Sequence, residues 1–349
     1  MRRDMLSLEE VENYRADPDR LFNSATHQEI LQGLTSDIYF IRTQEILRSM
    51  ELLETEVVGE IFPTKEGVLA GVEEVINFLR KINCGNLKVW AIPEGERVEK
   101  KEVVFRIQGP YGSFGLYETT MLGMLASSTG WATAARECKE AAGDKRVICF
   151  GARHVHPSVA PVMERAALVG GVDGCSCILG AKLKGTTPVG TVPHAVFLVV
   201  GDTVEVALKY DEIMPGDSPR IILVDTFKDE AEEALRVAEA LKEKLDGVRL
   251  DTPSERGGVT PGLVREVKAR LEQAGYPGVQ VLVSGGITVE RISDLSEAGA
   301  DAFGVGSYIS RAPAIDMTMD LKEINGEPRA KRGRIPGRVS NERLVRVEL

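Results

Sequence analysis

The sequence predicts an α/β fold with two parts: an irregular or incomplete βα (TIM-like) barrel, and an N-terminal α+β sandwich domain joined by the C-terminal tail. Between Val147 and Ser307, short apolar runs end in an Arg, His, Asp, Thr or a Gly-Gly pair, and segments with helical spacing separate them. Residues 57–107 instead form short β-type runs broken by turns such as PEGE and GPYG. After Ser307 the alternation stops. We therefore expect domains at residues 1–130, 131–310 and 311–349.

The first domain should begin with helices and continue with strands. Residues 1–20 are acidic and amphipathic, typical of a helix or a loosely packed arm. The segment HQEILQGLTSDIYFIRTQEILRSM has apolar residues at helical intervals, with Thr35, Ser36 and Asp37 available as a cap. Helices are predicted at 114–128 and 131–142. The residues predicted to lie in strands are Val57, Val58, Ile61, Val89, Trp90, Val103, Val104, Phe105 and Ile107.

Seven phrases make up the predicted barrel: VICF-GARHVH, GCSCILG, PVG-TVPH, RIILV-DT, VRL-DT, VQVLV-SGG and AFGVG-S. Each has an apolar strand with a polar end. In a parallel barrel the carboxyl ends of all strands open on one face. Polar residues can also simply terminate strands, but seven phrases in order disfavour that reading. We expect one shared pocket formed by Arg153, His194, Asp225, Arg249, Asp251 and Ser284.

The C-terminal segment and the composition narrow the function classes. DLKEINGEPRAKRG predicts a hairpin around Asn325-Gly326, followed by a basic tail that packs on the first domain. The net charge of -10 disfavours general nucleic-acid binding. No apolar run reaches the length of a membrane span, and the N-terminus lacks the pattern of a signal peptide. We expect a cytoplasmic protein without nucleic-acid or membrane partners.

The cysteines predict reduced thiols and no zinc site. An odd number of cysteines in a chain of this size is typical of cytosolic proteins, in which thiols stay reduced. Cys175 and Cys177 are too close in sequence for the usual zinc spacing. The five cysteines are Cys84, Cys138, Cys149, Cys175 and Cys177.

The ends of the last two predicted strands are rich in glycine and predict a phosphate site. They read Ser284-Gly285-Gly286 and Gly304-Val305-Gly306-Ser307. Glycines let backbone N–H groups approach an anion, and the loops after the seventh and eighth strands of βα barrels commonly bind phosphate. The alternative is a pair of tight turns with glycine at positive φ.

Two carboxylates end neighbouring phrases, Asp225 in LVDT and Asp251 in VRLDT. Carboxylates at such positions can hold ribose hydroxyls or a Mg²⁺ ion that carries a diphosphate. Arg249 should share a strand face with Asp251. The alternative is that Asp225 or Asp251 caps the next helix.

Of the four histidines, His194 is the candidate for chemistry. It follows a predicted strand and begins the next helix, where it could act as an acid, a base or a phosphate acceptor. We interpret His154 and His156 as structural. The sequence contains no Ser/His/Asp elbow, P-loop, zinc quartet or dinucleotide fingerprint.

Taken together, these motifs resemble the nicotinate phosphoribosyltransferase family, within the type II phosphoribosyltransferases. The likeness covers nearly the whole chain, in LTSDIYF, YETTMLGMLASSTGWATAAR, FGARHVHP, GTVPHA, LVDTF, VRLDT, SGGIT and GVGSYI. The resemblance implies synthesis of nicotinate mononucleotide and pyrophosphate from nicotinate and phosphoribosyl pyrophosphate, in NAD biosynthesis. Many members couple this reaction to ATP hydrolysis, and the sequence leaves open whether this chain does.

The resemblance also implies roles for single residues around the pyridine ring. Tyr39 resembles the aromatic residue that stacks on the ring from a neighbouring subunit, and Phe150 would cover the other face. Arg153 in FGAR resembles the residue that pairs with the nicotinate carboxylate, a task suited to a guanidinium. Arg136 would meet the pyrophosphate across a dimer, so a homodimer or higher homo-oligomer with shared active sites is implied.

The remaining roles concern the ribose and its phosphates. Arg249 and Asp251 resemble the pair at the ribose and diphosphate, with Mg²⁺ as the metal that accompanies phosphoribosyl pyrophosphate. Ser284 to Gly286 and Gly304 to Ser307 would hold the 5′-phosphate. His194 matches the histidine that ATP phosphorylates transiently in coupled members.

Departures from the pattern favour nicotinate as the substrate. Nicotinamide-using relatives place an acid where this chain has Ser176, in GCSC, and quinolinate-using relatives add basic residues in the same segment. No cysteine follows Cys177, so the zinc cluster of some compact members is not expected. The loop RLDT-PSERGG differs from the more usual RLDSGD, which puts the second acid of that loop in doubt. Three alternatives stay open: a quinolinate phosphoribosyltransferase that releases CO₂, a barrel isomerase or lyase acting on a phosphosugar, and a non-catalytic phosphometabolite-binding barrel.

Overall fold

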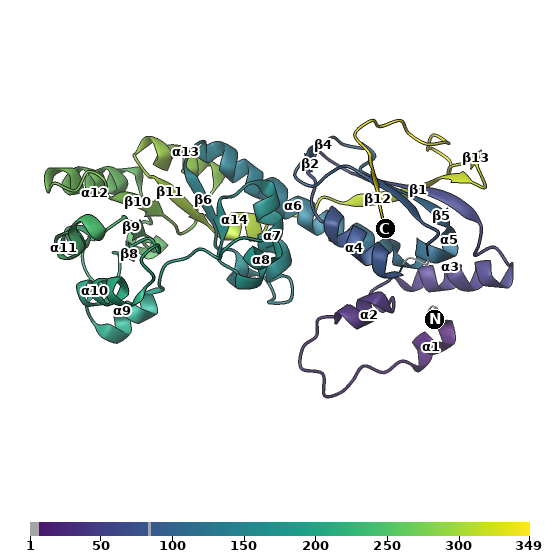
Figure 1. Ribbon diagram of the computed structural model, residues 1–349, viewed down its shortest axis with the longest axis horizontal. Coiled ribbons are helices and arrows are strands. Elements are labelled where there is room, and N and C mark those ends of the chain that lie inside the picture. The colour runs from purple at the N-terminus through teal and green to yellow at the C-terminus, as the bar shows by residue number, and fades with distance from the viewer. Residues whose placement is uncertain (1–6, 83–84) are drawn as a thin grey trace. The chain divides into compact units, whose positions relative to one another are not determined.

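The computed structural model describes residues 7–82 and 85–349 and contains two compact units. The first unit comprises Met1–Thr133 and Pro313–Leu349, and the second comprises Ala134–Ala312. Helix α6 (Glu118–Ala142) contains the division between Thr133 and Ala134. Each unit has its own sheet and its own core (Figure 1).

The first unit is built on a six-stranded antiparallel sheet in the order β13-β12-β1-β5-β3-β14. The C-terminal segment supplies three of these strands, because β12 pairs with β1 and β14 pairs with β3. A second, two-stranded sheet joins β2 to β4. The strands are β1 (Glu56–Pro63), β2 (Gly67–Val68), β3 (Lys88–Ala91), β4 (Arg97–Val98), β5 (Phe105–Pro110), β12 (Met317–Ile324), β13 (Glu327–Pro328) and β14 (Val345–Val347).

Helices pack against this sheet around one apolar core. Phe78 and Leu79 of α4, Leu116 before α6, and Ile61 and Ile107 of the sheet are buried in the same cluster. The helices are α1 (Leu8–Asn13), α2 (His27–Leu31), α3 (Ile38–Ser49), α4 (Val72–Ile82) and α5 (Tyr111–Phe114), followed by the 3₁₀ turn η1 (Gly115–Tyr117) and by α6. Alternating burial along β5 places one face of the strand on the core, as expected for a sheet covered on one side.

Several predictions for this unit are confirmed, and two are corrected. The hairpin at Asn325-Gly326 forms, with both residues at positive φ, 49° and 82°. Asp37 is the N-cap of α3. Val103 and Val104 precede β5 instead of lying in a strand. The two helices predicted at 114–128 and 131–142 are one continuous helix.

The predicted break in that helix has a different explanation. Gly130 lies inside α6, where a Cβ atom would collide with the carbonyl oxygen of Pro313. The glycine therefore allows the chain to pass close to the helix and does not end it.

The second unit is built on a six-stranded parallel sheet in the order β7-β6-β11-β10-β9-β8. Its strands are β6 (Arg146–Cys149), β7 (Gly174–Cys175), β8 (Ile221–Leu223), β9 (Gly247–Leu250), β10 (Gln280–Val283) and β11 (Ala302–Val305). Strands β6, β10 and β11 are buried over most of their length, which is typical of parallel strands covered on both faces. Among the described residues β7 and β8 form the two edges, so the barrel is incomplete and the predicted fold class is confirmed.

One of the seven predicted strands is wrong. The segment PVG at 188–190 contains no strand, although Val189 donates a backbone hydrogen bond to the carbonyl oxygen of Cys175 at the open edge of the sheet. Pro188 has no N–H group to donate, and glycine follows at 190. The chain therefore passes beside β7 without extending the ladder.

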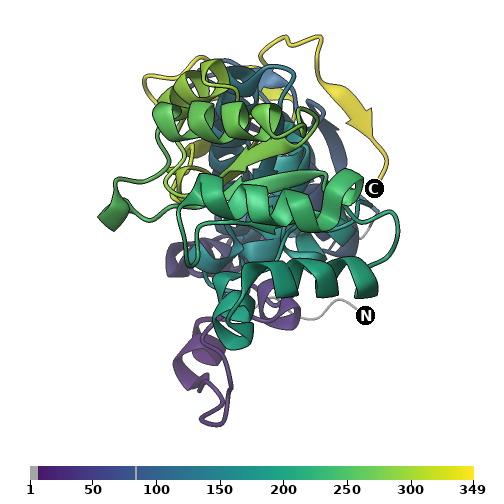
Figure 2. The same cartoon turned by 90° about the vertical axis from the view of Figure 1, so that its left-hand side faces the viewer.

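Helices alternate with these strands and cover the sheet. Figure 2, which faces this unit, shows helices in front of the strands, and α11 packs on both α10 and α12. The helices are α7 (Ala160–Gly170), α8 (Ile178–Leu183), α9 (His194–Val200), α10 (Thr203–Ile213), α11 (Glu230–Leu241), α12 (Pro261–Gln273), α13 (Val289–Glu297) and α14 (Ser307–Ser310). Short 3₁₀ turns are η2 (Ala152–His154), η3 (Lys242–Lys244) and η4 (Ser254–Arg256).

Two further findings concern the whole described chain. Within residues 7–82 and 85–349, no helix has both the length and the apolar character that a membrane crossing requires. Cys138, Cys149, Cys175 and Cys177 are free thiols, and Cys84 lies outside the described residues.

Candidate functional site

A pocket of about 300 Å³ opens at the carboxyl ends of the parallel strands in the second unit. It contains five of the residues to which the resemblance gives a role, and they come from three separate segments: the loop after β6, the start of α9 and the end of β9. Because parallel strands end at one edge, residues up to about 100 positions apart in sequence meet here. The lining residues are Phe150, Ala152, Arg153, Ser176, Gly190, Thr191, Val192, Pro193, His194, Leu223, Arg249 and Asp251.

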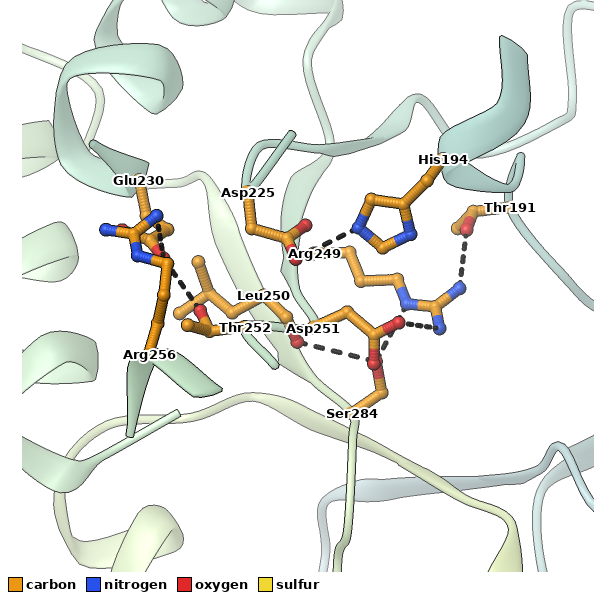
Figure 3. A network of polar contacts seen from close by, with 10 residues as sticks. All are labelled: Thr191, His194, Asp225, Glu230, Arg249, Leu250, Asp251, Thr252, Arg256 and Ser284. Atoms are coloured by element: carbon orange, nitrogen blue, oxygen red, sulfur yellow. Dashed lines mark hydrogen bonds and ion pairs between the residues drawn. The ribbon is translucent and has the colours of Figure 1, made fainter. Parts of the chain in front are cut away.

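Arg249 is the centre of the polar network in this pocket (Figure 3). It projects from β9, where its Nε donates to Oγ of Ser284 at 2.8 Å and its Nη1 donates to Oγ1 of Thr191 at 3.0 Å. Its Nη2 lies 3.4 Å from Oδ2 of Asp251. Burial lowers the pKa of the Arg249 guanidinium, while the nearby Asp251 carboxylate opposes this effect. The guanidinium is therefore held by neighbours on three sides.

Asp251 and Ser284 complete this network. The Ser284 hydroxyl donates to Oδ1 of Asp251 at 2.7 Å, so both carboxylate oxygens of Asp251 have partners. The Thr191 hydroxyl, which holds Arg249, was not predicted as a site residue, although it lies in the motif GTVPH. A network of this kind fixes the side chains before a ligand arrives.

His194 and Asp225 form a second pair at the same face (Figure 3). Nε2 of His194 lies 3.0 Å from Oδ2 of Asp225. The Asp225 side chain is completely buried, and burial raises the pKa of Asp225 while the hydrogen bond to His194 opposes the shift. The other carboxylate oxygen, Oδ1, is buried without a hydrogen-bond partner among the described residues. Because buried polar atoms normally have partners, this oxygen is a candidate contact for a bound cation or donor.

The suggestion that these carboxylates only cap helices is wrong. The N-cap of α11 is Asp229, and the N-cap of α12 is Thr260. Asp225 and Asp251 both precede these caps and direct their side chains to the polar networks described above.

Arg153 and Phe150 line the pocket from the loop after β6. Arg153 is exposed and has no hydrogen bond or ion pair within residues 7–82 and 85–349. The Phe150 ring lies under the Arg249 guanidinium, 5.0 Å from its central carbon, in a cation–π arrangement. The pocket therefore combines an aromatic face with an unengaged guanidinium.

Glycines at the end of β11 make room for this loop. A Cβ atom at Gly304 would lie 2.5 Å from the Phe150 ring, and one at Gly306 would lie 3.0 Å from Nε2 of His154. Neither glycine has a positive φ, so the tight-turn alternative is wrong for this pair. Their first function is to allow the close approach of Phe150 and His154.

The glycines after β10 behave differently. Gly285 and Gly286 have φ values of 86° and 61°, which side chains rarely adopt. Their N–H groups donate to no acceptor among the described residues. Arg291, which the sequence analysis did not single out, donates to both of their carbonyl oxygens at 2.9 and 2.8 Å and to the carbonyl oxygen of Val259. This loop therefore combines the left-handed backbone of a tight turn with unused N–H groups.

The Ser176 hydroxyl is bound by a carboxylate from outside its own segment. The segment GCSC itself contains no acid, as the sequence shows. The structure shows the buried carboxylate of Glu164, from α7, accepting a hydrogen bond from the Ser176 hydroxyl at 3.0 Å. Because Glu164 lies 12 residues away on a helix, the segment itself carries no signal of it.

The loop after Asp251 is anchored by another buried acid (Figure 3). The Thr252 hydroxyl donates to Oε1 of Glu230 at 2.8 Å, and the Arg256 guanidinium lies 3.5 Å from the same carboxylate. Glu230 does not line the pocket. Its contacts with Thr252 and Arg256 fix the start of the loop TPSERGG.

Tyr39 and Arg136 do not line this pocket. Tyr39 belongs to the first unit, on α3, where its side chain is 53% exposed and tilts against the Phe40 ring. Arg136 belongs to the second unit, on α6, where its Nε donates to the carbonyl oxygen of Gly170 at 2.6 Å. The predicted contributions of both residues to a neighbouring subunit stay predictions.

The donor set in the pocket fits a Mg²⁺ ion carried by a diphosphate. No group of three His, Cys, Asp or Glu side chains in the described part of the chain could hold a metal ion by itself. Mg²⁺ bound to a diphosphate needs only one or two carboxylates, since phosphate oxygens and water supply the other ligands. Asp251, which lines the pocket, is one such carboxylate, and the buried, unpartnered Oδ1 of Asp225, which lies beside His194 and outside the pocket lining, is the other candidate.

Relatives of known structure share this architecture. The chain is similar to the crystal structure of nicotinate-nucleotide pyrophosphorylase from Pyrococcus furiosus, with 44% identity, a TM-score of 0.86, and coverage of 91% of this chain and 82% of that one. It is also similar in fold to human nicotinic acid phosphoribosyltransferase, with 20% identity, a TM-score of 0.70, and coverage of 87% and 77%.

Curated relatives are nicotinate phosphoribosyltransferases. One from Mycobacterium tuberculosis is 30% identical over 253 residues, which cover 70% of this chain and 53% of the relative. One from Bacillus subtilis is 29% identical over 332 residues, which cover 84% and 67%. The chain thus spans only about half the length of the mycobacterial relative.

Family models cover both units of the chain. The N-terminal domain of quinolinate phosphoribosyl transferase matches residues 37–129, and its C-terminal domain matches residues 131–320. The chain therefore belongs to the family of phosphoribosyltransferase enzymes that these two quinolinate phosphoribosyl transferase domains define.

Proposed function

We propose that this protein is a nicotinate phosphoribosyltransferase, which forms nicotinate mononucleotide and pyrophosphate from nicotinate and phosphoribosyl pyrophosphate. The observation that carries the proposal is the combination of an aromatic ring, Phe150, with the unengaged guanidinium of Arg153 in one pocket. The Phe150 ring can stack on a flat aromatic ring, and the Arg153 guanidinium can pair with one carboxylate on that ring. The names of the curated relatives agree with this choice.

Catalysis of this reaction depends mainly on positioning the two substrates and on stabilising the charge that develops. The pyridine nitrogen attacks C1 of the ribose, and the bond from C1 to the diphosphate oxygen breaks, so positive charge develops on the ribose. Phe150 and Arg153 would orient the ring, and proximity of this kind replaces the need for a strong base. Arg249 and Asp251 would contact the ribose and the diphosphate, where electrostatic stabilisation has its largest effect. Bound Mg²⁺, held by Asp225 and Asp251, would neutralise charge on the leaving diphosphate.

The glycine loops would hold the 5′-phosphate. The free N–H groups of Gly285 and Gly286 support this assignment, because oriented backbone N–H groups form anion sites. Arg291 donates to the carbonyl oxygens of the same loop and thereby holds its backbone in place. Ser284 reaches the Arg249 network, and Gly304, Gly306 and Ser307 would complete the site from the next strand.

The His194–Asp225 pair supports a role for ATP as a co-substrate. With Nε2 bound to Asp225, Nδ1 of His194 has no partner among the described residues. This nitrogen would attack the γ-phosphorus of ATP, so that a phosphohistidine forms and ADP leaves. Asp225 would stabilise the ring as it takes on positive charge.

The complete site would need a second copy of the chain. Tyr39 would stack on the exposed face of the nicotinate ring, and Arg136 would reach the diphosphate, each from a neighbouring subunit. The exposed Tyr39 ring is compatible with such a contact. A homodimer or higher homo-oligomer is therefore part of the proposal.

Quinolinate phosphoribosyltransferase activity is the second candidate. The matching family models carry that name, and the 44% identical structure is that of a nicotinate-nucleotide pyrophosphorylase. The experiment that separates the two candidates mixes the protein with Mg²⁺, phosphoribosyl pyrophosphate and either pyridine acid, with and without ATP. Mononucleotide formed from nicotinate supports the proposal. Labelled CO₂ released from quinolinate, with no product from nicotinate, would establish the alternative.

A further inference from the structure

Glu164 is a buried carboxylate beneath one end of the pocket, and none of the roles discussed above uses it. Its side chain is completely buried in α7. Its Oε1 accepts from the N–H of Ala152 at 3.0 Å and from the Ser176 hydroxyl at 3.0 Å. Its Oε2 accepts from the N–H of Cys177 at 2.5 Å. Glu164 therefore joins the loop that carries Arg153 to the loop that carries Ser176.

The three partners also indicate the charge of Glu164. The two backbone N–H groups can only donate, and the Ser176 hydroxyl donates in this arrangement. No described group next to either oxygen accepts a proton from it, so the hydrogen bonds match the ionised form. Burial and the Glu164 charge both raise the pKa of the neighbouring Cys175 thiol, to about 12. The negative charge thus also acts on the Cys175 side chain at the end of β7.

The hydrogen bond to Glu164 determines what Ser176 can offer a ligand. Its single proton points to the buried carboxylate, so its oxygen presents only lone pairs to the pocket. A ligand carboxylate at Ser176 would face these lone pairs and, about 6 Å away across two hydrogen-bond lengths, the Glu164 charge. Of the two arginines among the described residues that line the pocket, Arg153 has the unengaged guanidinium, since Arg249 is held by Asp251, Ser284 and Thr191.

We propose that Glu164 is a specificity-determining residue that restricts this pocket to aromatic rings with one carboxylate and rejects adjacent dicarboxylates. The Arg153 guanidinium can pair with one ligand carboxylate, and the Glu164 charge opposes a second carboxylate near Ser176. This inference deepens the function proposed above and rests on it. Glu164 acts through Ser176 and Ala152, without touching the ligand.

The test compares nicotinate with quinolinate in the presence of Mg²⁺ and phosphoribosyl pyrophosphate. The KM for nicotinate and the inhibition constant of quinolinate against nicotinate are measured for the wild type, Glu164→Gln and Glu233→Gln. Glu233 is a matched control, because it is also a fully buried helical carboxylate, but its partner Arg236 does not line the pocket, whereas Ala152 and Ser176, the partners of Glu164, do. Glu164→Gln should shift the ratio of the two constants toward quinolinate by about 10-fold or more, since it removes a charge at close range.

If Glu164 had a purely structural role, its replacement would weaken the binding of both ligands to the same extent and leave this ratio unchanged. A ratio for Glu164→Gln within about 2-fold of the wild type would overturn the proposal, as would an equal shift in Glu233→Gln.

Ser176→Ala provides an independent test if Glu164→Gln does not fold. In this variant the Glu164 charge remains, so the ratio of the nicotinate KM to the quinolinate inhibition constant should stay within about 3-fold of the wild-type ratio. A ratio that shifts further than this toward quinolinate would show that Ser176, and not the Glu164 charge, sets the selectivity and would contradict the inference.

The outcome remains separable from that of the proposed function. If the wild type does not use nicotinate, the proposed function fails. Equilibrium binding of benzoate and phthalate, as inert rings with one and two carboxylates, then tests Glu164 alone. Stronger binding of phthalate than of benzoate to the wild type would refute the selectivity.

Discussion

Replacing Arg153 by alanine gives the sharpest test of how the pocket recognises its ring substrate. Arg153 lines the pocket, and within the described residues no hydrogen bond or ion pair engages its guanidinium. The substitution therefore removes a contact to the ligand without breaking one inside the protein. We expect the nicotinate KM to rise while the KM for phosphoribosyl pyrophosphate stays unchanged.

The size of the effect follows from the kind of bond that is lost. A hydrogen bond to a charged group contributes about 1.5–3 kcal/mol. Since about 1.4 kcal/mol corresponds to a tenfold change in affinity, the nicotinate KM should rise about 10- to 100-fold. The free energy of unfolding should change by no more than about 0.5 kcal/mol, as for other exposed positions.

Steady-state kinetics with each substrate varied in turn measures both KM values, and thermal unfolding measures stability. Arg270→Ala is a suitable control, because Arg270 is an exposed arginine on α12 whose partner is Glu266 on the same helix. A nicotinate KM that is unchanged in Arg153→Ala would refute the reasoning and make Arg153 a structural residue. A large loss of stability would refute the claim that its guanidinium has no internal role.

Three further predictions concern other parts of the chain. His194→Ala should lose stimulation by ATP and keep some uncoupled activity, measured as mononucleotide formed with and without ATP; stimulation that survives would exclude the phosphohistidine. Gly304→Ala should displace the Phe150 ring, because the new methyl group would lie 2.5 Å from it. This should lower stability by about 1–3 kcal/mol in chemical denaturation, and unchanged stability and nicotinate KM would contradict the close approach. Burial and the nearby Asp320 carboxylate raise the pKa of Glu118 from 4.5 to about 7. A raised carboxyl pKa makes the folded state lose stability as the pH rises from 4.5 to 7, so Glu118→Gln should be more stable than the wild type at pH 8 by about 1–3 kcal/mol. The two proteins should differ little at pH 4, and a difference independent of pH would contradict this assignment.

The polar ends of the strands were predictable from sequence because the pattern of the barrel is local. Each strand is a short apolar run, and the residue after it must lie at the carboxyl edge. Arg249, Asp251 and Ser284 could therefore be placed at one edge, and the structure brings them into one hydrogen-bonded network. The pairing of His194 with Asp225 follows from the same geometry.

Contacts that depend on packing between distant elements were not predictable. Glu164 reaches Ser176 from a helix, and Arg291 reaches the Gly285-Gly286 loop from the start of α13. Nothing in the sequence distinguishes these side chains from ordinary polar residues on helix faces. Pro188 was misread because an apolar Pro-Val-Gly run resembles a strand while lacking the donors that a ladder needs.

The glycines in the sequence predicted where the last two strands of the parallel sheet end, but not what each glycine does there. Gly285 and Gly286 have the left-handed backbone of a tight turn and free N–H groups. Gly304 and Gly306 instead leave room for the side chains of Phe150 and His154, which pack against them. The two glycine pairs look equivalent in the sequence. Only the packing around them shows that Gly285 and Gly286 have free N–H groups, whereas Gly304 and Gly306 lie in close contact with side chains.

The product formed from each pyridine acid distinguishes the two candidate activities of this protein. Purified protein, Mg²⁺ and phosphoribosyl pyrophosphate are incubated with nicotinate or with quinolinate, with and without ATP, and the mononucleotide and pyrophosphate are quantified. The pocket described here predicts nicotinate mononucleotide and an equal amount of pyrophosphate from nicotinate. Product from quinolinate alone, with release of CO₂, or no product from either acid, would contradict it.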